Sequence, residues 1–279
     1  GPWPGSRGAV LREGLALVEL KTGQFRDLIR FPLLDESGQT SRRPAYTVAN
    51  LTWSPDGRWV AFHKLGPSSS LNADGTTLAV IPTTGGKVID VATMLAYPDW
   101  VQWRPDSQVL GYIAGSGRDV WQGKELRLGY PPAFASGGRV GPIGVTPPGY
   151  TDVGFTWSPS CRRLAGAPPF GWSLATARIG PASPRDPYDR PLPAIFVDQR
   201  QVSRPAAPFA DVAPHWDCQR RLYWLRVSYE KAAVMAEDRP WVAVDVPTWY
   251  YGHWAVEEVL DWWPGATCKR KSARHQIRP

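Results

Sequence analysis

Four similar phrases, each built around a tryptophan, recur along this chain of 279 residues. Each phrase joins a Trp to a turn segment of the Ser-Pro-Asp-Gly type and then to an apolar strand, expected about seven residues after the Trp. The tryptophans are Trp53, Trp103, Trp157 and Trp216, about 50 to 60 residues apart. Internal repeats near this length predict solenoids, propellers or arrays. This period fits a four-stranded blade, so the predicted fold class is an all-β, β-propeller fold.

Further strands and turns fill the intervals between the phrases. After the first phrase, residues 77–81 and 87–91 flank a Gly-Gly turn. Near the N-terminus, residues 15–20 and 25–29 flank Thr22-Gly23 and repeat this second half of a blade. Glycine supplies the positive φ that tight hairpins need. Later strand candidates lie at residues 125–128, 194–197 and 241–246.

These segments predict how many blades the chain forms. It begins in the outer half of a blade and passes through four complete blades. Another Trp phrase then starts within residues 259–264. Half blades at both ends predict a five-bladed ring closed by the N- and C-terminal segments, which removes exposed sheet edges. Residues 1–264 would form this single domain, and residues 265–279 a basic tail. Six blades is the alternative, if residues 133–151 or 180–192 contain an atypical blade.

The first phrase resembles the repeats of the TolB-like, WD-like propeller family. Residues 53–57 read WSPDG and residues 60–62 read VAF, which match the family pattern fully, while the other three phrases match it in part. The resemblance implies that each Trp packs between blades and that the Pro-Asp-Gly segment forms the turn between the first two strands. It also implies an exported or surface-associated protein that binds other proteins.

Charge and hydropathy exclude several classes of function. The net charge of +7 comes mostly from the last 15 residues, which contain five cations and no acid: Lys269, Arg270, Lys271, Arg274 and Arg278. The nearly neutral remainder has no basic stripe, so sequence-specific nucleic-acid binding is not expected. The tail is either a solvated terminus or an arm for an anionic surface. No apolar run approaches the roughly 20 residues that span a bilayer.

Two of the three cysteines occupy similar turns in consecutive repeats. Cys161 follows Trp157 and Cys218 follows Trp216. Neighbouring blades would bring them within disulfide distance, and the alternative is two ordinary turn cysteines. No Cys or His pair has zinc-ligand spacing, so a structural zinc site is not expected.

Catalytic motifs are not evident. The four histidines accompany no G-x-S-x-G nucleophile motif, and no Gly-rich phosphate loop occurs. A polar residue does precede each Trp on the presumed innermost strand: Asn50, Asp99, Asp152, Asp211 and Glu257. No cofactor is expected except Ca²⁺, which this ring could coordinate around a propeller channel; the ring could alternatively hold an acid/base pair for glycoside chemistry. The alternative is that these residues stabilise strand starts.

An aromatic cluster follows the fourth repeat: Trp249, Tyr250, Tyr251 and Trp254. An exposed cluster of this kind would bind a protein or a sugar face, and a buried one would pack between blades. The leading hypothesis is a non-catalytic binding or assembly module with a protein partner. The alternative is a glycan-active enzyme, or a cation-binding lectin-like domain, that uses the carboxylates at the channel mouth.

Overall fold

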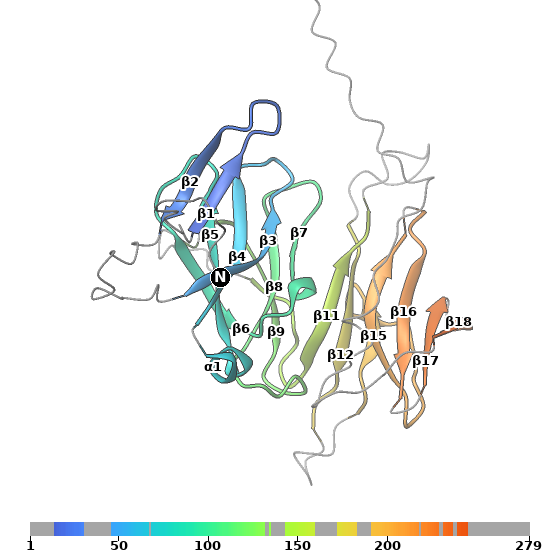
Figure 1. Cartoon of the computed structure of the whole chain (residues 1–279). Coiled ribbons are helices and arrows are strands. Elements are labelled where there is room, and N and C mark those ends of the chain that lie inside the picture. The colour runs from blue at the N-terminus through green and yellow to red at the C-terminus, as the bar shows by residue number, and fades with distance from the viewer. Residues whose placement is uncertain are drawn as a thin grey trace, which may run out of the picture. The chain divides into compact units, whose positions relative to one another are not determined.

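The computed structural model describes residues 14–30, 46–66, 68–131, 134, 143–159, 172–182, 191–217, 219–228, 231–236 and 239–244. In these residues the strands form four antiparallel four-stranded sheets and one two-stranded hairpin (Figure 1). The chain divides into two compact units, residues 1–153 and 154–279, which are taken in turn. The chain is therefore an all-β protein built of repeated four-stranded antiparallel sheets.

The first sheet of the first unit has its four strands in chain order: β3 (Thr47–Trp53), β4 (Trp59–Leu65), β5 (Thr76–Pro82) and β6 (Ile89–Met94). Trp53 pairs with Val60 across the turn that the first phrase predicts. Residues 60–63 of β4 are all buried, so both faces of this strand are covered. The short helix α1 (Ser69–Asp74) connects β4 to β5.

The N-terminal hairpin packs against this first sheet. It consists of β1 (Gly14–Val18) and β2 (Phe25–Arg30), close to the predicted residues 15–20 and 25–29. Leu15 joins an apolar cluster with side chains from β4 and β5: Val60, Phe62, Ala79 and Ile81. Arg26 also donates hydrogen bonds to the carbonyls of Thr83 and Thr84 in the β5–β6 turn. The hairpin is therefore a structural layer that packs on the two central strands of the first sheet.

The second sheet follows the 3₁₀ turn η1 (Pro98–Trp100) and contains β7 (Val101–Trp103), β8 (Leu110–Ala114), β9 (Glu125–Gly129) and β10 (Ile143–Gly144). All five residues of β8 are buried. The indole of Trp103 donates a 3.2 Å hydrogen bond to the carbonyl of Thr52 on β3. This bond ties the second sheet to the first.

The second unit contains the third and fourth sheets. The third begins with β11 (Thr151–Trp157), whose first residues belong to the first unit, and continues with β12 (Leu174–Ile179), β13 (Ala194–Val197) and β14 (Arg200–Gln201). The fourth contains β15 (Ala210–Trp216), β16 (Leu222–Val227), β17 (Ala232–Ala236) and β18 (Arg239–Val244). Both sheets are antiparallel meanders, like the two sheets of the first unit.

One predicted strand start is wrong. The strand that pairs with β11 begins at Leu174 and not about seven residues after Trp157. In the other phrases the second strand begins at Trp59, Leu110 and Leu222, close to the predicted spacing. The third phrase keeps the backbone pairing that closes the turn, because Ser158 and Ser173 bond to each other. An insertion therefore separates Trp157 from its partner strand.

The phrase tryptophans differ in exposure, although the resemblance implies that all four pack between blades. Trp103 and Trp157 are buried, and Trp216 is half-buried. Trp53 is 52% exposed and is not a member of the apolar cluster that joins the hairpin to β4 and β5. In the part of the chain that the structure describes, no helix is both long and apolar enough to cross a membrane.

Candidate functional site

Four of the five polar residues predicted to line a channel lie in the described part of the chain. Asn50, Asp152 and Asp211 lie on β3, β11 and β15, the first strands of three sheets, and Asp99 lies in η1 directly before β7. These positions agree with the predicted strand order, since each residue lies at or before the first strand of its sheet. Glu257 lies outside the described residues.

Asp152 is a fully buried carboxylate with polar partners in the first unit. Its side chain accepts a hydrogen bond from the Thr146 hydroxyl, and that same hydroxyl accepts one from the amide of Leu126. The Asp152 amide donates to the carbonyl of Lys124 at 3.0 Å. A buried carboxylate needs such partners because desolvation disfavours its charge. Asp152 thus connects the start of β11 to β9 of the preceding sheet.

Asp211 is also fully buried and forms an ion pair within the second unit. Arg226, on the neighbouring strand β16, donates from Nε to Oδ1 at 2.7 Å and from a terminal nitrogen to Oδ2 at 2.8 Å. The two residues face each other across the β15–β16 pairing. This bidentate geometry occupies both carboxylate oxygens. A metal or a substrate would have to displace Arg226 to reach them.

Asn50 and Asp99 are less enclosed. Asn50 has a φ of 51° and donates from its side-chain amide to the carbonyl of Ala96 at 2.9 Å. Asp99 is exposed, although neighbouring protein atoms raise the pKa of its carboxyl by desolvation. The exposed Asp99 carboxyl is therefore a surface group. Asn50 stabilises the connection between β3 and the segment before β7.

These contacts define what the predicted ring can do chemically. The two buried acids lie in different compact units and act as local structural anchors. Among the described residues, no group of three or more His, Cys, Asp or Glu side chains is arranged to hold a metal ion. The convergence of the five residues on one channel, with calcium or substrate bound there, remains a prediction.

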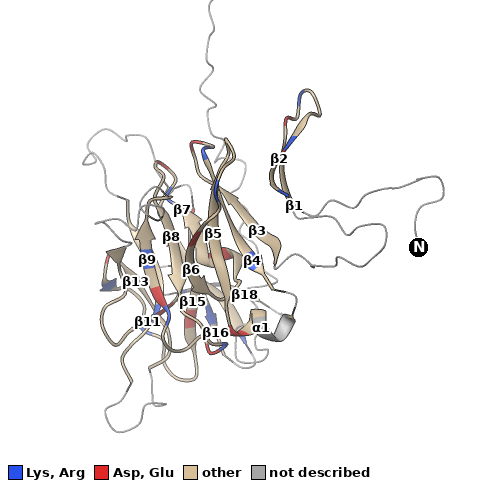
Figure 2. Cartoon of the chain, turned by 90° about the vertical axis from the view of Figure 1, so that its left-hand side faces the viewer, with Lys and Arg blue, Asp and Glu red and all other residues tan. Residues whose placement is uncertain are grey.

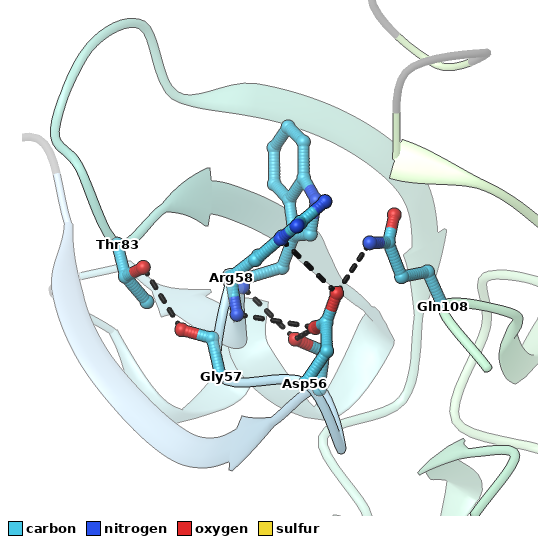
Figure 3. Close-up of polar contacts among 7 residues, drawn as sticks. Asp56, Gly57, Arg58, Thr83 and Gln108 are labelled. Carbon is cyan, nitrogen blue, oxygen red and sulfur yellow. Dashed lines mark hydrogen bonds and ion pairs between the residues drawn. The ribbon is translucent and has the colours of Figure 1, made fainter. Parts of the chain in front are cut away.

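The turn of the first phrase is a dense polar network (Figure 3). Asp56 accepts hydrogen bonds from the Ser54 hydroxyl at 2.6 Å and from the Arg58 amide at 3.1 Å. Its second oxygen accepts a hydrogen bond from Gln108 in the corresponding turn of the second sheet. Burial alone would raise the pKa of Asp56, but these hydrogen bonds lower it. Asp56 therefore stabilises its own turn and links two sheets.

The other phrases preserve parts of this network with different residues. In the second, Arg104 bonds to the Asp106 carboxylate at 2.8 Å. In the fourth, Asp217 accepts hydrogen bonds from the amides of Gln219 and Arg221 at 2.9 and 2.7 Å. Asp217 thus replaces the capping oxygens that the first phrase obtains from Ser54 and Asp56. These turns are structural, as the family resemblance implies.

Charged residues of both signs occur along the described strands and turns. Figure 2 shows Lys and Arg interspersed with Asp and Glu over strands and turns. Exposed apolar side chains occur on the hairpin, at Val18, Leu20 and Phe25, and on β3, at Leu51 and Trp53. Leu51 and Trp53 thus form an apolar surface on β3 that no other described residues bury.

Two buried cationic or titratable groups were not singled out by the sequence analysis. His63, on β4, is fully buried and neither ring nitrogen has a hydrogen-bond partner in the described structure. Burial lowers its pKa to about 4. Lys124 is 1% exposed and donates only to backbone carbonyls. Every residue has a backbone carbonyl, so the sequence does not reveal which carbonyls accept hydrogen bonds from Lys124. The sequence shows only that Lys124 is a cation.

Several predicted residues lie outside the described ranges. They include both disulfide candidates, Cys161 and Cys218, and the basic tail at residues 265–279. The aromatic cluster lies there too: Trp249, Tyr250, Tyr251 and Trp254. The disulfide and the aromatic contact surface stay predictions.

The solved structures that this chain is similar to include TolB and other propeller domains. TolB from Acinetobacter baumannii has 8% sequence identity and a TM-score of 0.42, with 84% of this chain and 48% of that chain covered. A putative TolB from Agrobacterium tumefaciens has 12% identity and a TM-score of 0.36, covering 85% and 91%. The β-propeller domain of the Trilobed protease from Pyrococcus furiosus has 10% identity and a TM-score of 0.34, covering 84% and 78%.

This chain spans about half the length of the Acinetobacter TolB and 38% of a similar prolyl endopeptidase chain. No family model and no curated protein matches it. The likeness is therefore one of fold, to TolB and propeller domains.

Proposed function

We propose that this chain is a non-catalytic β-propeller module that binds a protein partner. The observation that carries the proposal is that both buried carboxylates on first strands, Asp152 and Asp211, are engaged by other side chains. Asp152 is bonded to Thr146, and both oxygens of Asp211 are occupied by Arg226. Acid/base catalysis needs a carboxyl group within reach of a substrate. Residues that anchor strands instead favour a rigid scaffold on which loops provide the contact surface.

The proposed scaffold is a five-bladed ring in which the β1–β2 hairpin and residues 259–264 share one blade. Repetition within the chain supports this arrangement. On the second sheet, Val101 and Trp103 are both buried, and Trp103, which is only 7% exposed, donates a hydrogen bond to Thr52 of the first sheet. The corresponding residues of the first sheet, Leu51 and Trp53, are 49% and 52% exposed. A closing blade would bury this apolar surface, and the hairpin already packs on β4 and β5 of the same sheet.

The proposed contact surface is the aromatic cluster at Trp249, Tyr250, Tyr251 and Trp254. Tyrosine and tryptophan bury large areas with few rotatable bonds, so they provide affinity at low entropic cost. An exported or surface-associated location is part of the proposal. Calcium at the channel mouth is a secondary proposal, tested by comparing melting temperatures in calcium and in chelator.

The experiment begins with the full chain immobilised and exposed to an extract of its source cells. A captured protein is identified by mass spectrometry, purified, and titrated against wild type and variants. Trp249→Ala or Trp254→Ala should weaken binding by about 2 kcal/mol, roughly 30-fold, with an unchanged melting temperature. Phe25→Ala, at an exposed aromatic on the hairpin, is the matched control and should bind as wild type does.

Two outcomes would contradict the proposal. One is normal binding by both tryptophan variants, which would place the contact elsewhere. The other is turnover of a glycan that Asp99→Asn abolishes while the fold persists, which would favour the enzyme alternative.

A further inference from the structure

The loop between β8 and β9, residues 115–123, encloses the ammonium group of Lys124. Its Nζ lies within hydrogen-bonding distance of four backbone carbonyl oxygens, those of Ser116 at 3.0 Å, Gly117 at 3.1 Å, Asp119 at 2.7 Å and Gln122 at 3.2 Å. An ammonium has three N–H donors, so four acceptors exceed what separate hydrogen bonds would use. The arrangement is that of a cation surrounded by carbonyl dipoles.

The groups that contact Nζ are neutral carbonyls rather than carboxylates. The nearest carboxylate of the loop, Asp119, is engaged by the Trp121 amide and the Gln122 side chain, each at 2.8 Å. Burial lowers the pKa of the Lys124 ammonium, and the charge of Asp119 partly opposes that effect. Rings of backbone carbonyls bind monovalent cations in proteins, whereas divalent ions usually take carboxylate ligands. The donor set therefore fits a single positive charge.

The two ends of the loop, Gly115 and Gly123, lie against each other, and the loop also contacts the first sheet through Asp74. Gly115 has a φ of +133°, and a Cβ there would lie 2.2 Å from the carbonyl oxygen of Gly123, so only glycine fits. Gly117 donates its amide to the carbonyl of Asp74 at 2.6 Å, and Arg118 pairs with the Asp74 carboxylate at 2.7 Å. Asp74 ends α1, so the caged loop also connects two sheets.

We propose that residues 115–123 form a binding site for an ammonium-type monovalent cation, which the chain fills with its own Lys124 side chain. The tethered cation turns four carbonyls inward and so fixes the loop in the shape that meets α1. This inference does not depend on the proposed protein-binding function. Without a cation the carbonyls would turn toward water, and the loop would open.

The test uses chemical rescue in the full chain. Lys124→Ala removes three methylenes and the ammonium, which are the atoms of n-propylammonium. Loop opening is measured as the rate at which trypsin cleaves after the exposed Arg118, because proteolysis tracks the open population. Lys64→Met, at a lysine that pairs with Asp90 in the same unit, is the matched control.

We expect Lys124→Ala to be cleaved after Arg118 about tenfold faster than wild type, or more, and Lys64→Met to be cleaved like wild type. Millimolar n-propylammonium should restore protection to Lys124→Ala, whereas 1-propanol should not. Wild-type protection in Lys124→Ala, or equal protection by the amine and the alcohol, would overturn the proposal.

A measurement on the wild type keeps the proposal testable if Lys124→Ala fails to fold. A caged ammonium exchanges its protons slowly, so the Nζ proton signals of Lys124 should persist at neutral pH while those of the exposed Lys87 are lost. Loss of both at the same rate would contradict a caged cation.

Discussion

At the scale of single residues, His63 is a buried titratable group without hydrogen-bond partners in the described structure. It is fully buried, and its pKa falls to about 4 from 6.5. Because the unfolded chain binds the proton more readily, stability is retained above pH 6.5 and lost as pH falls toward 4. Between pH 7 and pH 5 this histidine should cost about 2 kcal/mol.

His63→Leu should therefore flatten the pH dependence of the free energy of unfolding, measured by urea denaturation at pH 7 and pH 5. Val60→Ala, at a buried residue of the same strand that does not titrate, serves as the control and should lower stability while retaining the wild-type slope. Equal slopes for wild type and His63→Leu would show that the ring is protonated without penalty in the folded state.

The Asp211–Arg226 pair makes a second residue-scale prediction. Arg226→Met should cost about 3–5 kcal/mol, since it leaves a fully buried carboxylate without its cation. The same change at Arg104, whose partner Asp106 is exposed, should cost less than about 1 kcal/mol. Urea unfolding of both variants measures the difference, and similar losses would mean that Asp211 is neutral or solvated when unpaired.

At the scale of the element, the turn of the first phrase depends on one side chain. Asp56→Ala removes acceptors for Ser54, Arg58 and Gln108, so it should lower stability by about 1–2 kcal/mol. Asp90→Ala, at an exposed surface pair, should change stability by less than about 0.5 kcal/mol. Thermal unfolding compares them, and an unchanged melting temperature for Asp56→Ala would make this network dispensable.

The sequence predicted elements where a short turn follows the tryptophan. The first, second and fourth phrases place β4, β8 and β16 close to the expected positions, because Trp, turn and strand are contiguous in each. The prediction from the third phrase was wrong, because the apolar residues that follow Trp157 fit the repeat pattern but the strand that pairs with β11 begins at Leu174. Hydrophobic pattern alone does not show how many residues separate a strand from its partner.

The sequence located the polar inner-strand residues but not their roles. Asp211 meets Arg226 through strand register, and Asp152 meets Thr146 through a connection between sheets. Neither partner has a fixed spacing from its acid that a sequence pattern could reveal. These partners determine whether a carboxylate can bind a ligand or instead holds two strands together. The role of each carboxylate therefore follows from the three-dimensional structure and not from the sequence.

At the scale of the whole molecule, Trp53 reports on ring closure. If a terminal blade covers β3, Trp53→Ala should cost about 3–5 kcal/mol, like Trp103→Ala, because both would leave a buried cavity. If the first sheet stays uncovered, a residue that is 52% exposed should cost less than about 1 kcal/mol. Urea denaturation of the two variants decides between these cases, and a small loss at Trp53 alone would contradict the closed ring.

The meandering order of the strands also has a consequence for how the chain folds. Every described four-stranded sheet pairs strands that are neighbours in the sequence, so its hydrogen bonds join residues made close together in time. Low sequence separation between contacts favours fast folding, and domains form from the N-terminus during synthesis. Each sheet can thus assemble soon after it leaves the ribosome. The β1–β2 hairpin is an exception, because it can bury Leu15 only after β4 and β5 have been synthesised.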